Sequence, residues 1–305
     1  MSYSSDVKLE IMGSFPKSLH CRIAELAGFI AINGRLEEDD FGKYLAIRVE
    51  NSDFDDRIRR LVRIISDIPD ENIQKVDVKS HHRKLIIRNE DDIENLIGRL
   101  KLKSFGTRVG IDDIITQRGC CRTSYLKGAF LAGGVIGSPE KAYQLEINTP
   151  REEEADKLIK LLAGLDVKAG KNHSRGRYSV YVKEGDSIAN LIGSLGATNG
   201  LMEFENVRIL KDIRNSINRE VNCDTANIAK TAGAAAKQLE DIRFISDKVG
   251  LGSLPEELRI VAQGRVDNPD LTLKELGESL VPPLGKSGVN HRMRRISKIA
   301  EELRG

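Results

Sequence analysis

Hydrophobic and polar positions follow the same order twice in the first 200 residues of the chain. In each half, apolar and small residues at helical spacing come first, an alternating strand-like run follows, and a charged amphipathic helix comes next. A basic strand or hairpin and a third helix complete each half. The predicted elements lie at residues 21–32, 44–49, 53–66, 82–88 and 93–100, and again at 124–136, 143–147, 151–163, 178–183 and 188–195. The pattern predicts one helix–strands–helix–strands–helix unit, present twice.

Sequence identity between the halves supports a repeat. Residues 93–100 read IENLIGRL and residues 188–195 read IANLIGSL, so six of eight positions are identical. In the first helices, Leu26-Ala27-Gly28 aligns with Leu131-Ala132-Gly133. Small residues let two helix backbones approach more closely than the usual 8–10 Å or so. We expect these helices to pack together across a pseudo-twofold axis, although burial in two unrelated cores would also explain them.

After about residue 205 the pattern becomes predominantly helical. We expect residues 215–245 to be helical with breaks at residues 222–224 and at Gly233. A first tail helix is predicted from Pro255 to about Arg265. A capping box of Thr272 and Glu275 predicts a short second helix to about residue 280, and a third helix, capped by Ser287, runs to about residue 303. The second and third helices match the helix-turn-helix pattern.

The third tail helix carries a concentrated positive charge. Residues 286–298 contain five basic residues and no acid. Val289, Met293, Ile296 and Ile299 fall at core-facing spacing, which leaves a polar face for a DNA groove, where Asn reads adenine and Arg reads guanine. The candidate DNA-binding residues are Lys286, Ser287, Asn290, His291, Arg292, Arg294, Arg295 and Lys298, with Lys286, Ser287 and Arg295 better placed for phosphates. The alternative is a solvated basic face on a small helical bundle.

Further polar clusters are candidates for contacts with the DNA backbone or with a protein partner. One cluster lies within the predicted linker helix and contains Asn218, Arg219, Asn222, Asn227 and Lys230. The others lie in the basic strands of the two halves and contain His81, His82, Arg83, Lys84 and Arg88, and Lys168, Lys171, His173, Arg175 and Arg177. The alternatives are local capping in the first case and ordinary solvated loops in the second.

Composition narrows the function classes. The 305 residues carry 48 Lys+Arg against 46 Asp+Glu, and the net charge of +2 argues against a basic nucleic-acid binder only if the charge is evenly spread. The sequence has no membrane-length apolar run and no signal-peptide order, so we expect a cytoplasmic, nucleoid-associated protein. Its four cysteines and five histidines show no zinc-ligand spacing along the chain. We expect no metal, cofactor, membrane partner or small-molecule substrate.

The paired Leu-Ala-Gly helices, each followed by a strand hairpin, resemble the LAGLIDADG homing endonuclease fold. With the helix-turn-helix added, the whole order is similar to the WhiA family of bacterial regulators. The segments carrying the resemblance are 125–134, 138–141, 145–146, 218–219, 222–224, 226–227 and 254–303. The resemblance implies an α+β fold, with a pseudo-twofold duplicated LAGLIDADG-like αββαββα domain followed by an all-α helix-turn-helix domain. We place the domains at 1–205 (repeats about 14–105 and 117–200), 206–250 (helical linker) and 251–305.

The resemblance implies a sequence-specific transcriptional regulator that binds double-stranded DNA, linked to sporulation, cell division or chromosome segregation. LAGLIDADG endonucleases hold a divalent metal with an acid near the end of each motif. Our alignment puts Asn33 and Ser138 at these positions, and neither is an anion, so we expect no catalytic residue and no nuclease activity. The alternatives are a metal-dependent LAGLIDADG-type DNA endonuclease and a structural nucleoid or division factor whose helix-turn-helix holds a protein.

Overall fold

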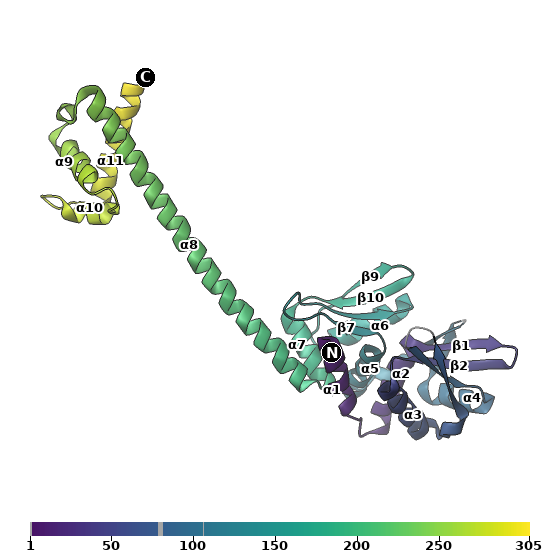
Figure 1. Ribbon diagram of the computed structural model, residues 1–305. Helices are drawn as coiled ribbons and strands as arrows, with labels where there is room; N and C mark the ends of the chain where they lie inside the picture. Colours follow the sequence, from purple (N-terminus) through teal and green to yellow (C-terminus); the bar gives the residue numbers. More distant parts are fainter. Residues whose placement is uncertain (1, 79–81, 106) are drawn as a thin grey trace. The chain divides into compact units, whose positions relative to one another are not determined.

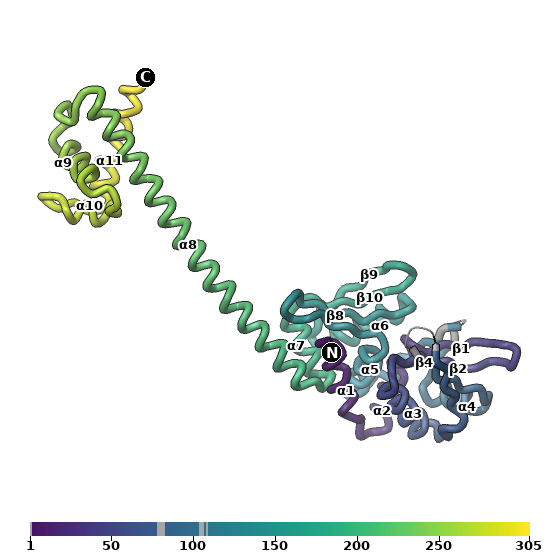
Figure 2. Tube along the Cα trace, viewed as in Figure 1, coloured from purple at the N-terminus to yellow at the C-terminus, as the bar shows by residue number. Residues whose placement is uncertain are grey.

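The computed structural model describes residues 2–78, 82–105 and 107–305. The chain divides into two compact units, Met1–Lys211 and Asp212–Gly305, which are described separately (Figure 1). Figure 2 follows the same chain as a trace coloured by residue number. Within the described ranges, no helix is both long and apolar enough to cross a bilayer.

The first unit contains the repeat. It opens with α1 (Tyr3–Gly13). The first copy consists of α2 (Leu19–Asn33), β1 (Gly34–Asp39), β2 (Gly42–Val49), α3 (Ser52–Ser66), β3 (Ile73–Val78), β4 (His82–Ile87) and α4 (Glu90–Leu100). The second copy consists of α5 (Gly119–Gly133), β7 (Gly134–Ile136), β8 (Leu145–Thr149), α6 (Glu152–Ala163), β9 (Gly170–Ser174), β10 (Arg177–Val182) and α7 (Gly185–Leu195). Both copies are therefore αββαββα, as the sequence pattern predicts.

Each copy builds its own antiparallel sheet. The strand order is β3-β4-β2-β1-β6-β5 in the first sheet and β7-β8-β10-β9 in the second. The four strands of the second sheet correspond in order to β1-β2-β4-β3 of the first, so the repeat is also present in the sheet topology. The hairpin of β5 (Leu102–Phe105) and β6 (Arg108–Ile111) extends the first sheet beyond β1. No counterpart of this hairpin is present among the described residues of the second copy.

The amphipathic helices follow from the alternation of apolar and charged residues. In α3, Phe54, Ile58, Leu61 and Ile65 are buried at helical spacing, and the Asn51 side chain accepts hydrogen bonds from the first turn. The predicted third helix of each copy is also present. It buries Ile93 and Leu96 in α4, and Ile188 and Leu191 in α7. These faces close a single core around the α2–α5 pair.

The two first helices pack directly against each other, as their small residues predict. A Cβ atom on Gly28 would lie 2.2 Å from the Tyr125 carbonyl oxygen, and one on Gly128 would lie 1.9 Å from the Glu25 carbonyl oxygen. Backbone thus meets backbone at two reciprocal glycines, a separation that side chains at these positions would not allow. The contact confirms the helix pairing across a pseudo-twofold axis and rules out two unrelated cores.

The contact also corrects the alignment of the two helices. Both have 15 residues, and Leu19 and Gly119 begin them while Asn33 and Gly133 end them. Gly28 is therefore equivalent to Gly128, and the alignment of Leu26-Ala27-Gly28 with Leu131-Ala132-Gly133 is wrong by five residues. Three shared letters in two helices rich in small residues were too short a signal to fix the register.

The second unit consists of most of α8 (Thr198–Val249), then α9 (Glu256–Asp267), α10 (Leu273–Ser279) and α11 (Lys286–Arg304). Contrary to the prediction, α8 runs without interruption through residues 222–224 and Gly233, because helix propensity is only a weak prior for a single position. Ile242 and Ile245 of α8 join Leu258, Val261 and Leu276 in the core of this unit.

Candidate functional site

Two features fix the turn that precedes α10. The Thr272 hydroxyl accepts a hydrogen bond from the Glu275 backbone N–H, and the Glu275 carboxylate accepts one from the Thr272 N–H, which confirms the predicted capping box. The guanidinium of buried Arg265 donates hydrogen bonds to the carbonyl oxygens of Asn268, Pro269 and Leu271. The chain between α9 and α10 is thereby fixed in place.

Gly277 brings the turn after α10 onto the helix itself. Its carbonyl oxygen accepts a 2.9 Å hydrogen bond from the Leu284 N–H, and a Cβ atom at this position would lie 2.1 Å from the Leu284 carbonyl oxygen. The close approach needs a residue without a side chain. It sets where α11 begins, and therefore which of its residues face outward.

The core side of α11 agrees with the sequence pattern. Val289, Met293 and Ile296 are buried, whereas Ile299 is half-buried and Ala300 completes the buried stripe. The predicted cap is wrong by two residues, because Gly285 occupies the N-cap position and makes no side-chain hydrogen bond. Ser287 instead lies in the first turn, where its side chain is exposed.

One exposed stripe runs along α11. Ser287, His291, Arg294 and Lys298 are all exposed and are spaced by four, three and four residues, so they lie on one helical face. Lys298 lies 3.8 Å from Glu302 one turn later. Within the described part of the chain, the side chains of Ser287, His291 and Arg294 make no hydrogen bond or ion pair. We call these four residues the α11 stripe. Lys286 is exposed beside it, and Asn290 is half-buried.

Two of the candidate arginines face α9 instead. Arg295 pairs with one carboxylate oxygen of Glu257, and Arg292 lies 3.8 Å from the other. Arg292 is half-buried, and its Nε has no hydrogen-bond partner among the described residues. These two residues therefore face α9 and help to hold α11 against it.

The residues of the polar cluster on α8 are exposed, as is every residue from 212 to 234. Arg219, Asn222, Asn227 and Lys230 are all exposed. The side-chain amide of Asn227 lies 3.6 Å from the Cys223 sulfur one turn earlier. Since α8 is continuous here, these residues do not cap a helix break, which removes the local explanation for them.

Most candidate bases of the repeat are already neutralised. Lys84 pairs with Glu37 at 3.0 Å, Arg83 with Asp77 at 3.3 Å, and Arg88 makes a two-bond pair with Asp39. Lys171 lies 2.6 Å from Glu152 and 2.7 Å from Asp156 of α6, and Lys168 lies 3.6 Å from Glu184. Arg175 and Arg177 are exposed and make no ion pair within the described ranges. His81 lies outside the described residues, and His82 is described only as part of β4.

A cleft of about 540 Å³ opens where the C-terminal ends of α2 and α5 meet. Asn33 ends α2, and its side-chain amide donates a 3.1 Å hydrogen bond to the Ala132 carbonyl oxygen. The equivalent residue of α5 is Gly133, not Ser138, which lies beyond β7. A Cβ atom on Gly133 would lie 2.3 Å from the Asn148 carbonyl oxygen, so an acidic side chain does not fit there without a backbone shift.

Basic side chains line the same cleft. Burial acts to raise the pKa of Glu37, but hydrogen bonds from Lys84 and Tyr44 outweigh it and lower that pKa. The lining also includes Arg35, Arg48 and Arg177. Arg35 and Arg48 were not among the predicted contacts. Their side chains are exposed on β1 and β2, respectively. No three carboxylates in the described ranges of the chain gather at this cleft as a metal site would require.

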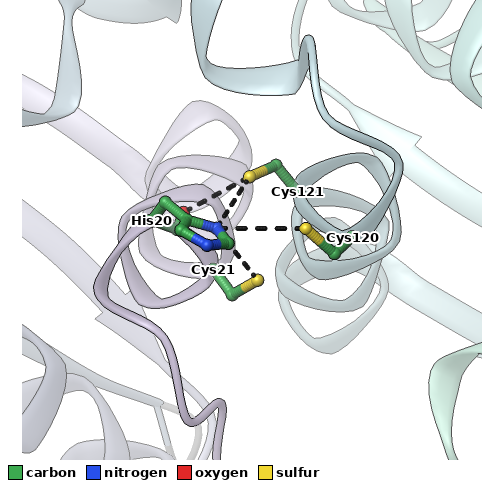
Figure 3. Close-up of side chains that lie close together, drawn as sticks. All are labelled: His20, Cys21, Cys120 and Cys121. Carbon is green, nitrogen blue, oxygen red and sulfur yellow. Dashed lines mark hydrogen bonds between the residues drawn. The ribbon is translucent and has the colours of Figure 1, made fainter.

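The opposite ends of α2 and α5 hold a cluster that spacing along the chain did not reveal. His20, Cys21, Cys120 and Cys121 come within 4.8 Å of one another, measured between the atoms that could bind a metal (Figure 3). Their spacing along the chain gave no sign that these four side chains lie together. The residues are about a hundred positions apart, but the register of the two helices makes His20 equivalent to Cys120 and Cys21 equivalent to Cys121.

Comparison with known proteins places the chain in a family. The family model of the WhiA LAGLIDADG-like domain matches residues 122–214, and that of the WhiA C-terminal HTH domain matches residues 217–300. The Probable cell division protein WhiA of Alkaliphilus oremlandii (strain OhILAs) is 38% identical over 316 residues, covering 99% of this chain and 98% of that protein. The chain belongs to the WhiA family.

Further relatives agree with this membership. The Probable cell division protein WhiA of Desulfitobacterium hafniense (strain Y51) is 39% identical over 306 residues, covering 99% of this chain and 96% of that protein. The crystal structure of full-length WhiA from Thermatoga maritima is similar with a TM-score of 0.58 and 26% identity, and the similarity covers 99% of both chains. WhiA membership confirms the α+β fold with a LAGLIDADG-like region and a helix-turn-helix.

Proposed function

We propose that this WhiA family protein is a sequence-specific DNA-binding transcriptional regulator linked to cell division, sporulation or chromosome segregation. The observation that carries the proposal is the α11 stripe, with Arg294 and His291 exposed on the third helix of a rigidly capped helix-turn-helix. A recognition helix in a major groove needs such a face, because base edges are read by side chains free to hydrogen-bond. The division link rests on the names that its relatives carry.

Roles within the motif follow from position. His291 and Arg294, near the middle of the stripe, are best placed for base edges, and Asn290 borders them. Lys286 and Ser287 lie in the first turn of α11, where the helix dipole and free backbone N–H groups favour a phosphate. Arg292 and Arg295 are proposed to contact flanking phosphates, which requires their ion pairs with Glu257 to open. Because the proposed function is DNA binding, we also propose a nucleoid-associated, cytoplasmic location.

For the repeat, we propose binding without cutting. Arg35, Arg48 and Arg177 line the cleft at the helix ends and would contact phosphates rather than bases. The exposed α8 segment with Arg219, Asn222, Asn227 and Lys230 is proposed to serve DNA or a protein partner. We propose no nuclease activity, because Asn33 and Gly133 stand at the two helix ends and neither offers the carboxylate that a hard divalent cation prefers.

Genome-wide mapping of bound DNA tests the regulator proposal. Wild-type protein should occupy a limited set of sites that share a motif, and Arg294→Ala should lose that set while its amount in the cell stays the same. Lys237→Ala, a change of an exposed α8 lysine outside every proposed contact, serves as the matched charge control. Equal occupancy for wild type and Arg294→Ala would show that α11 is not the recognition helix.

A supercoiled-plasmid assay with Mg²⁺ tests the nuclease alternative. We expect the plasmid to remain supercoiled at protein concentrations that saturate DNA binding. Cleavage that Asn33→Ala abolishes would establish the endonuclease and overturn the regulator proposal for the repeat unit.

A further inference from the structure

The cluster of His20, Cys21, Cys120 and Cys121 joins the two halves of the repeat at the N-terminal ends of α2 and α5. Figure 3 shows two of these side chains arriving from each helix and turning toward a common point. The His20 Nδ1 atom lies 3.2 Å from the Cys121 sulfur, 3.3 Å from the Cys21 sulfur and 3.9 Å from the Cys120 sulfur. One nitrogen and three sulfurs thus surround a small volume.

These separations suit a tetrahedral cation. Zinc bonds of about 2.3 Å to sulfur and about 2.0–2.1 Å to nitrogen place neighbouring tetrahedral ligands roughly 3.6–3.8 Å apart. The three nitrogen–sulfur distances bracket the lower of these values, and every ligand atom lies within 4.8 Å of the others. The ligand atoms therefore lie within about an ångström of the separations that a tetrahedral zinc site requires.

The surroundings also favour an anionic complex. Three thiolates and a neutral imidazole around a divalent cation carry a net charge of −1. All four residues lie in the first turns of α2 and α5, and neither Ser18 nor Arg118, the N-cap residues, makes a side-chain capping hydrogen bond. Two positive helix ends therefore converge on the cluster. The burial is graded, because Cys121 is buried, His20 and Cys21 are half-buried, and Cys120 is exposed, which leaves a path for the ion.

We propose that His20, Cys21, Cys120 and Cys121 form a structural zinc site that links the two repeats at the end of the α2–α5 pair opposite the cleft. Three cysteines and one histidine are a ligand set typical of closed structural zinc sites. Binding exchanges thiol protons for the cation, so each cysteine releases its proton to solvent as its sulfur becomes a thiolate. No sulfur is oxidised. The site is independent of DNA recognition by α11.

Metal titration of the full-length protein tests the proposal. Protein reduced with a phosphine and stripped with a chelator should bind one Zn²⁺ per chain in competition with a chromophoric chelator. Co²⁺ should bind with the same stoichiometry, with thiolate-to-cobalt charge-transfer absorption and the strong visible bands of a four-coordinate ion. Failure to bind either ion more tightly than the same protein with all four ligands changed would overturn the site.

Single substitutions distinguish Zn²⁺ binding at the cluster from adventitious Zn²⁺ binding elsewhere on the protein. Cys120→Ser changes an exposed ligand and should leave the fold intact, yet it should weaken Zn²⁺ binding by more than the roughly 10–100-fold caused by losing an outer-sphere partner. His20→Ala should do the same and should alter the cobalt bands. Cys223→Ser, which changes the exposed cysteine of α8, is the matched control and should bind like wild type.

Two outcomes would contradict the proposal directly. One is a Zn²⁺ affinity that Cys120→Ser and His20→Ala leave unchanged while circular dichroism shows both variants folded. The other is a protein isolated under reducing conditions with a disulfide between cluster cysteines, detected as two cluster cysteines that resist alkylation until the protein is reduced, since a cystine cannot supply the thiolate ligands.

Discussion

The two units use basic residues in opposite ways. In the repeat, Lys171 contacts two acids of α6 and Lys84 contacts Glu37, so these bases are neutralised locally, whereas Arg175 and Arg177 make no ion pair within the described ranges. In the helix-turn-helix, Arg294 and His291 make no ion pair within the described ranges, while the paired Arg292 and Arg295 lie to one side. The number of basic residues in the sequence does not distinguish the two regions. A cation that is already paired with a carboxylate must break that ion pair before it can contact a phosphate. We therefore expect α11 to contribute most of the free energy of DNA binding.

The largest effect should come from removing the support of α11. In Gly277→Ala the new methyl group would overlap the Leu284 carbonyl oxygen, and overpacking of this kind costs roughly 1–3 kcal/mol, with more where backbone must move. We expect a lower melting temperature for the second unit and loss of specific DNA binding, measured by circular dichroism and fluorescence anisotropy. The β-sheet signal of the repeat should persist.

The control for this variant is Gly288→Ala in α11. Its Cβ would lie 3.4 Å from the nearest atom, the flexible end of Arg292, and alanine should favour the helix by up to about 1 kcal/mol. Equal melting temperatures for the two variants would show that the close turn at Gly277 does not hold the motif together.

A smaller effect on DNA affinity should distinguish unpaired basic residues from those already in ion pairs. Arg294→Ala should weaken binding to a specific site by about 10- to 100-fold, because a good arginine–base contact is worth roughly 1–3 kcal/mol of discrimination. Lys171→Ala should change the affinity by less than about twofold, since its charge already serves Glu152 and Asp156. Anisotropy titrations at two salt concentrations measure both. If the two substitutions cost the same, the contrast between the units is wrong.

The smallest effect concerns the capping box. Hydrogen bonds from the Thr272 backbone and side chain lower the pKa of Glu275 below its usual value. A lowered folded-state pKa contributes stability above the unfolded pKa of about 4.3, and that stability is lost as pH falls through the folded value. The melting temperature of wild type should therefore drop below about pH 4.3 more than that of Glu275→Gln, whose amide keeps the bond at any pH. Parallel pH profiles for the two proteins would contradict this.

Local and periodic features of the fold were predictable from the sequence. The six identical positions at 93–100 and 188–195 correctly predicted α4 and α7, and Thr272 with Glu275 correctly predicted the start of α10. The buried stripe of α11 followed from its apolar spacing. These features depend on interactions within a few residues or on a pattern that recurs.

Features set by contacts between distant segments were not predictable in the same way. The register of α5 depends on Gly28 and Gly128 meeting backbone, so Gly133 rather than Ser138 stands opposite Asn33. Acids from α6 that neutralise Lys171 are fifteen and nineteen residues away in the chain. The cysteine cluster had one usable signal, since His20-Cys21 and Cys120-Cys121 precede Gly28 and Gly128 by the same distance, but the alignment error concealed it.

The reciprocal packing of α2 and α5 has a consequence for how this protein can vary. A homodimer with twofold symmetry must place the same residue twice at its axis, so any substitution there is made in both subunits at once. Here both helices belong to one chain, and many of their equivalent positions carry different residues. Asn33 faces Gly133 at one end, and His20 accompanies Cys120 at the other. A repeat within one chain thus permits unlike partners at a pseudo-twofold axis where a symmetric dimer allows only pairs of identical side chains.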